Sequence, residues 1–287
     1  MRLKRLLAVI GLCGVAATAR TEVLKINGST TVNLPVAEAA EILRAEQGLH
    51  IQVDTQGGSA GGISMLGDGQ VQIGMSSKPL SDEDRAKFPK TQFKAIRIGE
   101  DAVALIVAPD VWEGGVHALS KAQVQAIYEG KVTNWKEVGG PHQRIVFFNK
   151  EPGRGTWEVF AHWLYGNPKQ APLVSFPEVG GNEETRNKVA STRGAISQLS
   201  SSWADGKGVF ALGIKNEDGE VIAPTGENLA RHRYPMSRPL FLLTNGEPQG
   251  DAKTFVDFLL SARGQALVRK HGYLSLDQLH AEPAEKP

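Results

Sequence analysis

Three segments of the sequence place glycines, hydroxyls and backbone amides where they could bind an anion. Each has an apolar run before it, a turn rich in Gly, Ser and Thr, and an amphipathic run after it; the turns are residues 27–31, 56–62 and 149–156. The first turn of a helix leaves N–H groups unpaired and carries the positive end of the helix dipole. Glycine lets an anion approach these amides, and hydroxyls add donors. The pattern therefore predicts an anion site built from several helix beginnings.

The turn at 149–156 differs from the other two because it also carries two cations, Lys150 and Arg154. A Ser or Thr helix cap needs no cation, whereas a desolvated oxyanion has many lone pairs to satisfy. A further segment, residues 76–79, follows an expected strand and places Ser77 at its carboxyl end, where open α/β sheets bind ligands. A single turn is better explained as a structural cap or loop, so the interpretation depends on the convergence of several turns.

Short apolar runs alternate with amphipathic segments over most of the chain, which indicates an α/β protein. The expected strands are residues 23–26, 50–54, 71–75, 93–98, 103–107, 144–148, 208–212 and 239–243. The expected helices are residues 34–47, 121–128, 157–165, 183–199 and 252–271. Ser120 and Asp251 are predicted N-caps, and Gly272 is a predicted C-cap.

Four stretches match a known family of proteins. They are residues 26–32, 57–62 and 151–156, and the run LSKAQVQAIYEGKVTNWKEVGG at 119–140. On these residues the chain resembles the PstS-type phosphate-binding proteins, the substrate-binding components of phosphate ABC importers, over nearly all of its length after residue 19. The resemblance implies an α/β protein of the type II periplasmic-binding-protein fold, with two α/β lobes joined by two crossover strands and the ligand in the cleft. It implies inorganic phosphate as ligand, membrane permease subunits as partners, no catalysis and no cofactor.

The same resemblance assigns the ligand positions. They fall on Thr31 and the Val32 amide, with Ser29 and Thr30 adjacent, and on Ser59, Lys150, Arg154, Gly155 and Thr156, while Ser77 belongs to the site as the position where many relatives carry Asp. Well-studied relatives have Arg at the position of Lys150 and Ser at that of Arg154. A lysine gives up the bidentate geometry of arginine, and Arg154 in the same loop could restore a planar donor fork.

The change at Ser77 bears on selectivity. Phosphate at neutral pH retains an O–H, which a carboxylate can accept, whereas sulfate has no such proton and is repelled by the carboxylate. Ser77 repels far less. The sequence therefore predicts phosphate binding with weaker exclusion of other tetrahedral oxyanions.

The length of the chain, 287 residues, favours two lobes. If the crossovers are the strands at 103–107 and 239–243, the first lobe consists of residues 20–105 and 238–287, and the second of residues 106–237. This division follows from the family resemblance. The acidic tail at 280–287 is expected to fray.

Residues 1–19 are typical of an export signal. Basic residues precede an apolar run at 6–15, and Ala17 and Ala19 give the small-x-small pattern at the cleavage site. Cys13 lies within this leader after Leu12, where a lipobox requires a small residue, so the processed chain would contain no cysteine. The protein is expected to be exported, periplasmic and monomeric. With 32 basic and 31 acidic residues, the chain gives no support for nucleic-acid binding.

Two other classes of function remain open. Residues 57–61 fit the G-x-S-x-G pattern of a serine hydrolase with Ser59 as nucleophile, although no histidine has an evident acidic partner, and His162 and His232 are the mid-chain candidates. An anion-binding sensor or adhesin could use the same fold. The histidines lack the spacing of a metal site, so no metal is expected.

Overall fold

The computed structural model describes residues 22–280. The predicted export signal, Cys13 and the cleavage site at Ala19 lie outside the described residues, as does the chain beyond His280.

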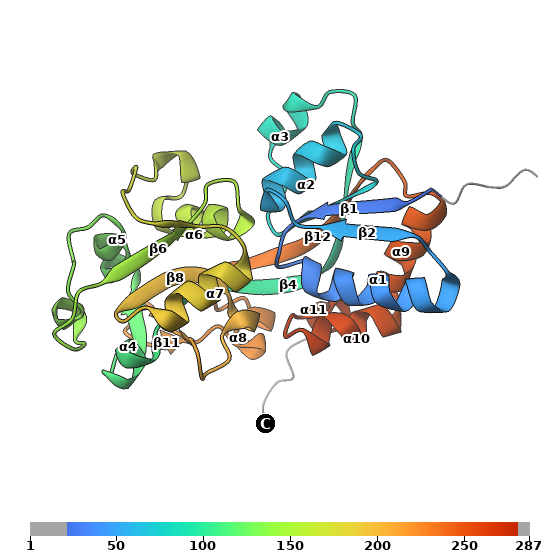
Figure 1. Ribbon diagram of the computed structural model, residues 1–287. Coiled ribbons are helices and arrows are strands. Elements are labelled where there is room, and N and C mark those ends of the chain that lie inside the picture. The colour runs from blue at the N-terminus through green and yellow to red at the C-terminus, as the bar shows by residue number, and fades with distance from the viewer. Residues whose placement is uncertain (1–21, 281–287) are drawn as a thin grey trace, which may run out of the picture.

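Within the described residues, one mixed sheet runs through both ends of the molecule (Figure 1), with strand order β2-β1-β3-β12-β4-β8-β6-β7 and with β9 paired to β4. The bounds are β1 Leu24–Gly28, β2 Ile51–Asp54, β3 Ile73–Ser76, β4 Phe93–Val107, β6 Val146–Lys150, β7 Glu178–Val179, β8 Ala195–Ser200, β9 Phe210–Ala211 and β12 Ser237–Asn245. A small second sheet has the order β11-β10-β5, with β5 Ala118–Ser120, β10 Gly213–Lys215 and β11 Val221–Ile222.

Helices cover this sheet in two groups, which we call lobe one and lobe two (Figure 1). Lobe one carries α1 Asn33–Gln47, α2 Gly58–Gly67, α3 Asp82–Lys87, α9 Gly250–Leu260, α10 Ala262–Lys270 and α11 Leu276–His280. Lobe two carries α4 Pro109–Glu113, α5 Lys121–Tyr128, α6 Gly155–Tyr165, α7 Asn182–Ser191 and α8 Gly226–Ala230, with the short 3-10 helices η1 Trp135–Val138, η2 Pro168–Gln170 and η3 Ser201–Trp203.

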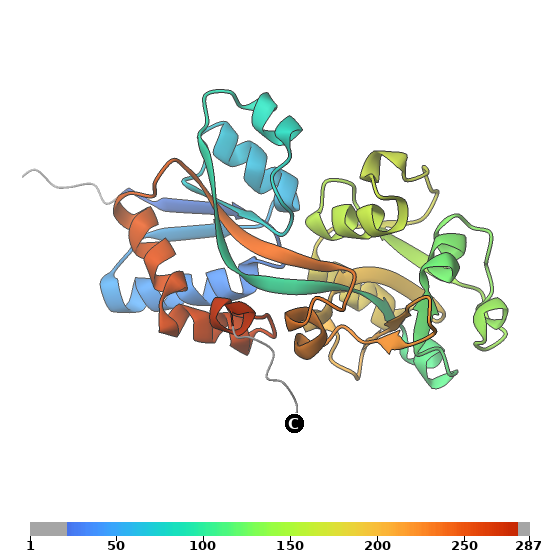
Figure 2. The same ribbon diagram turned by 180° about the vertical axis from the view of Figure 1, so that it is seen from behind.

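The two long strands β4 and β12 pair antiparallel and cross from one lobe to the other (Figure 2). Their register runs from Phe93 opposite Asn245 to Ala102 opposite Ser237. In lobe one, β12 pairs antiparallel with β3, and in lobe two, β4 pairs antiparallel with β8. The sheet is therefore continuous through the region between the lobes, and a residue at the middle of either long strand lies close to both.

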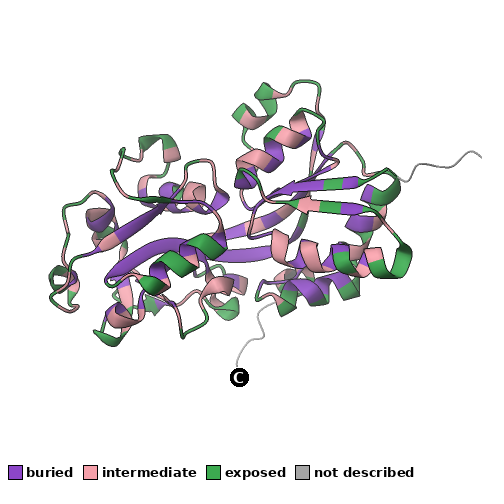
Figure 3. Ribbon diagram, viewed as in Figure 1, coloured by how far each residue is buried: buried purple, intermediate pink, exposed green. Residues whose placement is uncertain are grey.

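Each lobe has its own hydrophobic core on both faces of the sheet, and the central strands are buried (Figure 3). In lobe one, Val36 and Leu43 of α1 pack with Phe255 of α9, and a second cluster lies under α2. In lobe two, the largest cluster includes the large side chains of Tyr128, Trp135 and Phe160, which are at most 1% exposed. Burial on both faces is what a doubly covered sheet requires.

Several predicted elements are confirmed. The helix at 121–128 is α5, and Ser120 caps it, its hydroxyl accepting a hydrogen bond from the N–H of Gln123 at 3.2 Å. The two predicted strands at 93–98 and 103–107 are one strand, β4, because Glu100 and Asp101, which resemble a polar break, are buried within it.

Two predicted helices are wrong in part. The helix predicted at 183–199 ends at Ser191, and residues 195–200 form β8, a fully buried strand between β4 and β6. The helix predicted at 252–271 is broken at Ser261, which caps α10. The prediction of Asp251 as an N-cap is wrong, because α9 begins at Gly250 with Gln249 as its N-cap and Asp251 lies in the first turn. The predicted C-cap is wrong by one residue, because His271 is the C-cap of α10 and Gly272 follows it with a φ of +79°.

Candidate anion-binding site

A small cavity lies between the two lobes, where the predicted turns converge. All of the predicted site residues except Val32 line it, together with two that were not predicted, Gly58 and Asn182. The lining residues of lobe one are Ser29, Thr30, Thr31, Gly58, Ser59 and Ser77; those of lobe two are Lys150, Arg154, Gly155, Thr156 and Asn182. The site is therefore assembled by the fold from five separate turns.

The turn after β1 is organised by Ser29. Its hydroxyl accepts hydrogen bonds from the N–H groups of Thr31, at 3.3 Å, and Val32, at 3.4 Å, and donates to the Ser77 hydroxyl at 2.9 Å. Val32 is fully buried, and its amide is directed to Ser29. The N-terminus of α1 thus reaches the cavity through Ser29 and Thr31, while Val32 lies behind them.

The turn before α2 joins the same cluster. Gly57 and Gly58 have φ values of +72° and +58°, a left-handed backbone that glycine adopts without strain. This path brings the Ser59 hydroxyl to 3.1 Å from the Ser77 N–H, which donates to it, and to 3.3 Å from the Ser77 hydroxyl. Hydroxyls from three turns of lobe one therefore share one wall of the cavity.

Gly155 brings the start of α6 directly against lobe one. A methyl group at this position would lie 2.5 Å from the Ser77 hydroxyl, 2.8 Å from the Ser77 carbonyl oxygen and 2.9 Å from the Ser59 hydroxyl. No side chain fits at such distances. Glycine at 155 is therefore a condition for the approach of the two lobes.

Lys150 is buried and is fully occupied by lobe two. Its Nζ donates to the carbonyl oxygens of Gly180, at 2.8 Å, and Gly181, at 3.0 Å, and to the Asn182 Oδ1 at 3.3 Å. Burial lowers the pKa of Lys150, as do the nearby Arg154 and Arg238 charges. Three acceptors nevertheless match the three hydrogens of an ammonium group. Lys150 thereby holds the turn that carries Asn182.

Asn182 then connects the lobes. Its Nδ2 donates to the Thr31 Oγ1 at 3.0 Å. Asn182 was missed from the sequence because its helix was predicted to begin one residue later, although Gly180 and Gly181 form another glycine turn before a helix. That turn was the available signal.

Arg154 is the cation closest to the outside, with 16% of its side chain exposed. Its Nε and Nη2 donate to the Glu151 Oε2 at 2.9 and 2.7 Å. Its Nη1 makes no hydrogen bond with any of residues 22–280. The side chain lies against Gly58, where a methyl group would be 2.9 Å from the Arg154 Cδ. Arg154 therefore lines the cavity with one nitrogen still able to donate.

Beneath the cavity lies a buried ion pair that was not predicted. Arg238 of β12 faces Asp101 of β4 in the strand register, and their side chains are 0% and 1% exposed. Burial raises the pKa of Asp101, and the Arg238 charge opposes that rise. The signal that could have found the pair was one acidic and one basic residue, Asp101 and Arg238, each directly beside an apolar run of an expected crossover strand.

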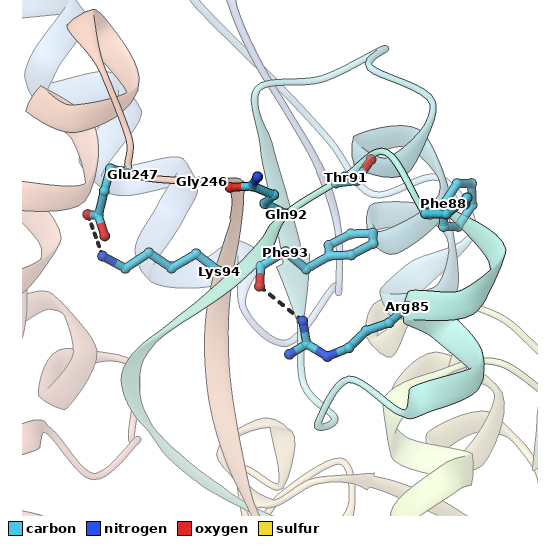
Figure 4. A pocket seen from close by; sticks show the side chains of 9 residues that line it. Arg85, Phe88, Thr91, Gln92, Phe93, Lys94, Gly246 and Glu247 are labelled. Carbon is cyan, nitrogen blue, oxygen red and sulfur yellow. Dashed lines mark hydrogen bonds and ion pairs between the residues drawn. The ribbon is translucent and has the colours of Figure 1, made fainter.

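A second hollow lies on lobe one alone (Figure 4), and it differs from the cavity between the lobes in how its cations are used. Its cations are already paired, because Arg85 donates to the Phe93 carbonyl oxygen at 3.1 Å and Lys94 pairs with Glu247. Within residues 22–280 no cluster of His, Cys, Asp or Glu could hold a metal ion. The described helices include none long and apolar enough to cross a membrane.

Comparison with known proteins agrees with this architecture. The model of the PBP superfamily domain matches residues 15–263. The chain is 31% identical over 262 residues to the phosphate-binding protein PstS of Bacillus subtilis, a match that covers 89% of this chain and 81% of the relative. This chain belongs to the PstS-type family of phosphate-binding proteins.

Solved structures extend the match to three dimensions. A phosphate ABC transporter substrate-binding protein from Clostridium perfringens with bound phosphate has 30% identity and a TM-score of 0.78, covering 89% of this chain and 100% of that one. An ABC-type phosphate transport receptor from Vibrio cholerae has 27% identity and a TM-score of 0.67, covering 88% of this chain and 99% of the receptor. The PstS-type chain has the type II periplasmic-binding-protein fold that was predicted.

The serine-hydrolase interpretation of Ser59 is not supported. Among the described residues, its hydroxyl is hydrogen-bonded only to Ser77, and neither His162 nor His232 is among its partners. A nucleophilic serine needs a base within hydrogen-bond reach. The PstS-type family is one of binding proteins and not of enzymes.

Proposed function

We propose that this protein captures inorganic phosphate between its two lobes and delivers it to an ABC importer. The observation that carries the proposal is the cavity in which Thr31 and Ser59 of lobe one face Arg154 and Thr156 of lobe two. Support also comes from the PstS name of the Bacillus subtilis relative and from the phosphate bound to the Clostridium perfringens protein. A charged donor with hydrogens to spare, such as Arg154, together with hydroxyl donors in a buried cavity is what a desolvated oxyanion requires.

Binding would work by drawing the lobes together. We propose lobe boundaries at residues 20–105 with 238–287 and at 106–237, so that β4 and β12 act as the connection. Two contacts join the lobes outside the cavity lining: the Ala60 N–H donates to the Gly153 carbonyl oxygen at 3.2 Å, and Lys169 pairs with Glu83 at 2.7 Å. An anion that contacts both lobes shifts the equilibrium toward the closed form.

The partners and location follow from this role. The closed, phosphate-loaded form would be recognised by the permease subunits of the importer, with the binding protein acting as a monomer. Export would use residues 1–19 as the signal, with cleavage near Ala19. We propose a periplasmic location for the processed chain.

The ligand selectivity is proposed to be relaxed. No carboxylate is among the residues that line the cavity within the described chain, and Ser77 takes the position at which many relatives have Asp. Sulfate should therefore also bind, with an affinity within a few orders of magnitude of the affinity for phosphate. Calorimetric titration tests this directly: sulfate binding that is undetectable at millimolar concentration would count against relaxed selectivity.

The steric role of Gly155 gives a sharp test of binding between lobes. Gly155→Ala places a methyl group against Ser77 and should lower phosphate affinity at least tenfold, measured by calorimetry. Gly226→Ala is the matched control, because its methyl group would meet nothing nearer than 3.5 Å. Wild-type affinity in Gly155→Ala would show that phosphate does not bind between these walls.

A further inference from the structure

Arg238 lies under the anion site but is not one of the predicted ligands. It projects from the middle of β12, and its side chain is completely buried. Its Nε and Nη2 donate to the Asp101 Oδ2 at 3.0 and 2.7 Å. Two of its hydrogens are thus committed to the carboxylate of the facing crossover strand.

The remaining hydrogens of Arg238 reach hydroxyls of both lobes. Its Nη1 donates to the Thr156 Oγ1 at 2.9 Å and to the Ser77 Oγ at 3.2 Å, and its Nη2 donates to the Thr31 Oγ1 at 3.0 Å. An arginine has five N–H donors in a fixed fork. All of them are used by the protein, so Arg238 has no hydrogen left for an anion.

These hydrogen bonds determine whether each hydroxyl can still accept a hydrogen bond or can only donate one. A threonine hydroxyl has two lone pairs and one hydrogen. The Thr31 Oγ1 accepts from both Arg238 and Asn182, which occupies both lone pairs. The Ser77 Oγ likewise accepts from Arg238 and from the Ser29 hydroxyl. Thr156 accepts from Arg238. What remains at Thr31 and Ser77 is the hydrogen, which at Ser77 can be donated either to the Ser59 Oγ, 3.3 Å away, or to a bound anion.

We infer that Arg238 is a positioning residue that commits the hydroxyls of Thr31 and Ser77 to donate toward the bound anion, and that occupies one of the two lone pairs of Thr156. The inference rests on the proposed function, since it names how that site selects its ligand. Hydroxyls that can only donate, as at Thr31 and Ser77, favour oxyanions whose facing oxygens all accept hydrogen bonds. Such hydroxyls offer no acceptor to the O–H group that phosphate carries and sulfate lacks.

The position of the guanidinium is itself fixed. The Ser200 hydroxyl donates to the Asp101 Oδ1 at 2.8 Å, and the Tyr273 hydroxyl donates to the Thr31 carbonyl oxygen at 2.9 Å. Ser202 lies between these two groups, with its hydroxyl 2.8 Å from that of Ser200 and 3.1 Å from that of Tyr273. This closed network holds Asp101 and the Thr31 turn in one frame. A lysine ammonium has three hydrogens and could not serve the same four partners.

The test compares phosphate with sulfate. In the double variant Asp101→Asn with Arg238→Gln, the buried pair is replaced by two neutral amides, which avoids leaving Asp101 without its partner. Hydroxyls released from Arg238 can accept a hydrogen bond from the O–H group of phosphate, whereas sulfate has no such hydrogen to donate. The calorimetric affinity for sulfate should therefore fall at least tenfold more than that for inorganic phosphate. Arg238→Lys should change the ratio in the same direction, and Arg233→Gln, a half-exposed arginine paired with Glu220, is the control.

Other results would overturn the inference. An equal loss for both anions would mean that Arg238 contributes charge or scaffolding alone, and unchanged affinities would mean that it does not act on the site. A wild-type ratio in Arg238→Lys would show that charge suffices, and this variant decides the question if the double variant does not fold. The phosphate titration of the wild-type protein tests the proposed function separately, because a protein that does not bind phosphate cannot have it. In that case the sulfate affinities of the wild-type protein and its variants still decide the role of Arg238. Wild-type protein that binds neither anion overturns both.

Discussion

Two arginines at the cavity, Arg154 and Arg238, each pair with a carboxylate, yet their surroundings differ completely. Arg238 is wholly buried on a crossover strand and uses all its donors within the protein. Arg154 is partly exposed on a turn, and its partner Glu151 is 44% exposed. The comparison shows one cation that shapes the site and another that remains able to contact the ligand.

The two pairs should also contribute differently to stability and binding. Breaking a buried pair strands a charge in a medium of low dielectric constant, which is costly, whereas an exposed pair is worth about 0–1 kcal/mol. Substitutions at Arg238 should therefore affect folding most, and substitutions at Arg154 should affect phosphate affinity most.

The largest effect is expected for Arg238→Ala. It leaves Asp101 buried without its partner and should lower the free energy of unfolding by about 3–5 kcal/mol. Urea denaturation followed by circular dichroism measures this. A loss below about 1 kcal/mol would remove the contrast between the two arginines.

The pH dependence of that variant sharpens the same point. Burial already raises the pKa of Asp101, and without Arg238 nothing comparable opposes the rise. Between the pKa of the unfolded chain and the higher pKa of the folded variant, the folded state binds more protons, so its stability increases as the pH falls. The difference in the free energy of unfolding between wild type and Arg238→Ala should therefore become smaller from pH 7 toward pH 5. A difference that is constant over this range would mean that Asp101 does not take up the proton.

Arg154→Ala should give the reverse pattern. Removing a donor to a desolvated anion should cost about 2–4 kcal/mol of phosphate binding, an affinity loss of about 30- to 700-fold. The free energy of unfolding should change by less than about 1 kcal/mol. Arg193→Ala, in which the lost side chain is 86% exposed, is the control. Unchanged phosphate affinity would place Arg154 outside the site.

The smallest effect is expected for Glu151→Gln. The change removes a negative charge beside the anion and releases Arg154 from its partner. Phosphate affinity should rise by about two- to fivefold at low ionic strength and by less at high salt, because the group is exposed and screened. Glu41→Gln breaks a similar i,i+3 pair on α1 and should leave affinity unchanged. A loss of affinity in Glu151→Gln would mean that Arg154 depends on Glu151 for its position.

The turns of the site were predictable because their pattern is local. A strand, a glycine turn and a helix within a few residues of one another identify the turns that contain Ser29, Ser59 and Thr156 without knowledge of the fold, and the family resemblance then assigned these residues to the ligand. Lys150 and Arg154 were recognised for the same reason. What the sequence did not show is that Lys150 uses its hydrogens on the Gly180–Gly181 carbonyls, since that depends on the path of a distant loop.

The missed parts depend on long-range pairing. Arg238 and Asp101 are 137 residues apart and become partners only through the register of β4 and β12. Residues 195–200 resemble the continuation of a helix and become β8 because they fill the place between β4 and β6. In both cases tertiary position outweighs local propensity.

A crystal structure of the protein grown with phosphate tests the central claim most directly. The account predicts tetrahedral density in the cavity within hydrogen-bond distance of Ser59, Thr156 and Arg154, with every Arg238 nitrogen still bonded to protein. Density elsewhere, or an Arg238 nitrogen bonded to the anion, would contradict it.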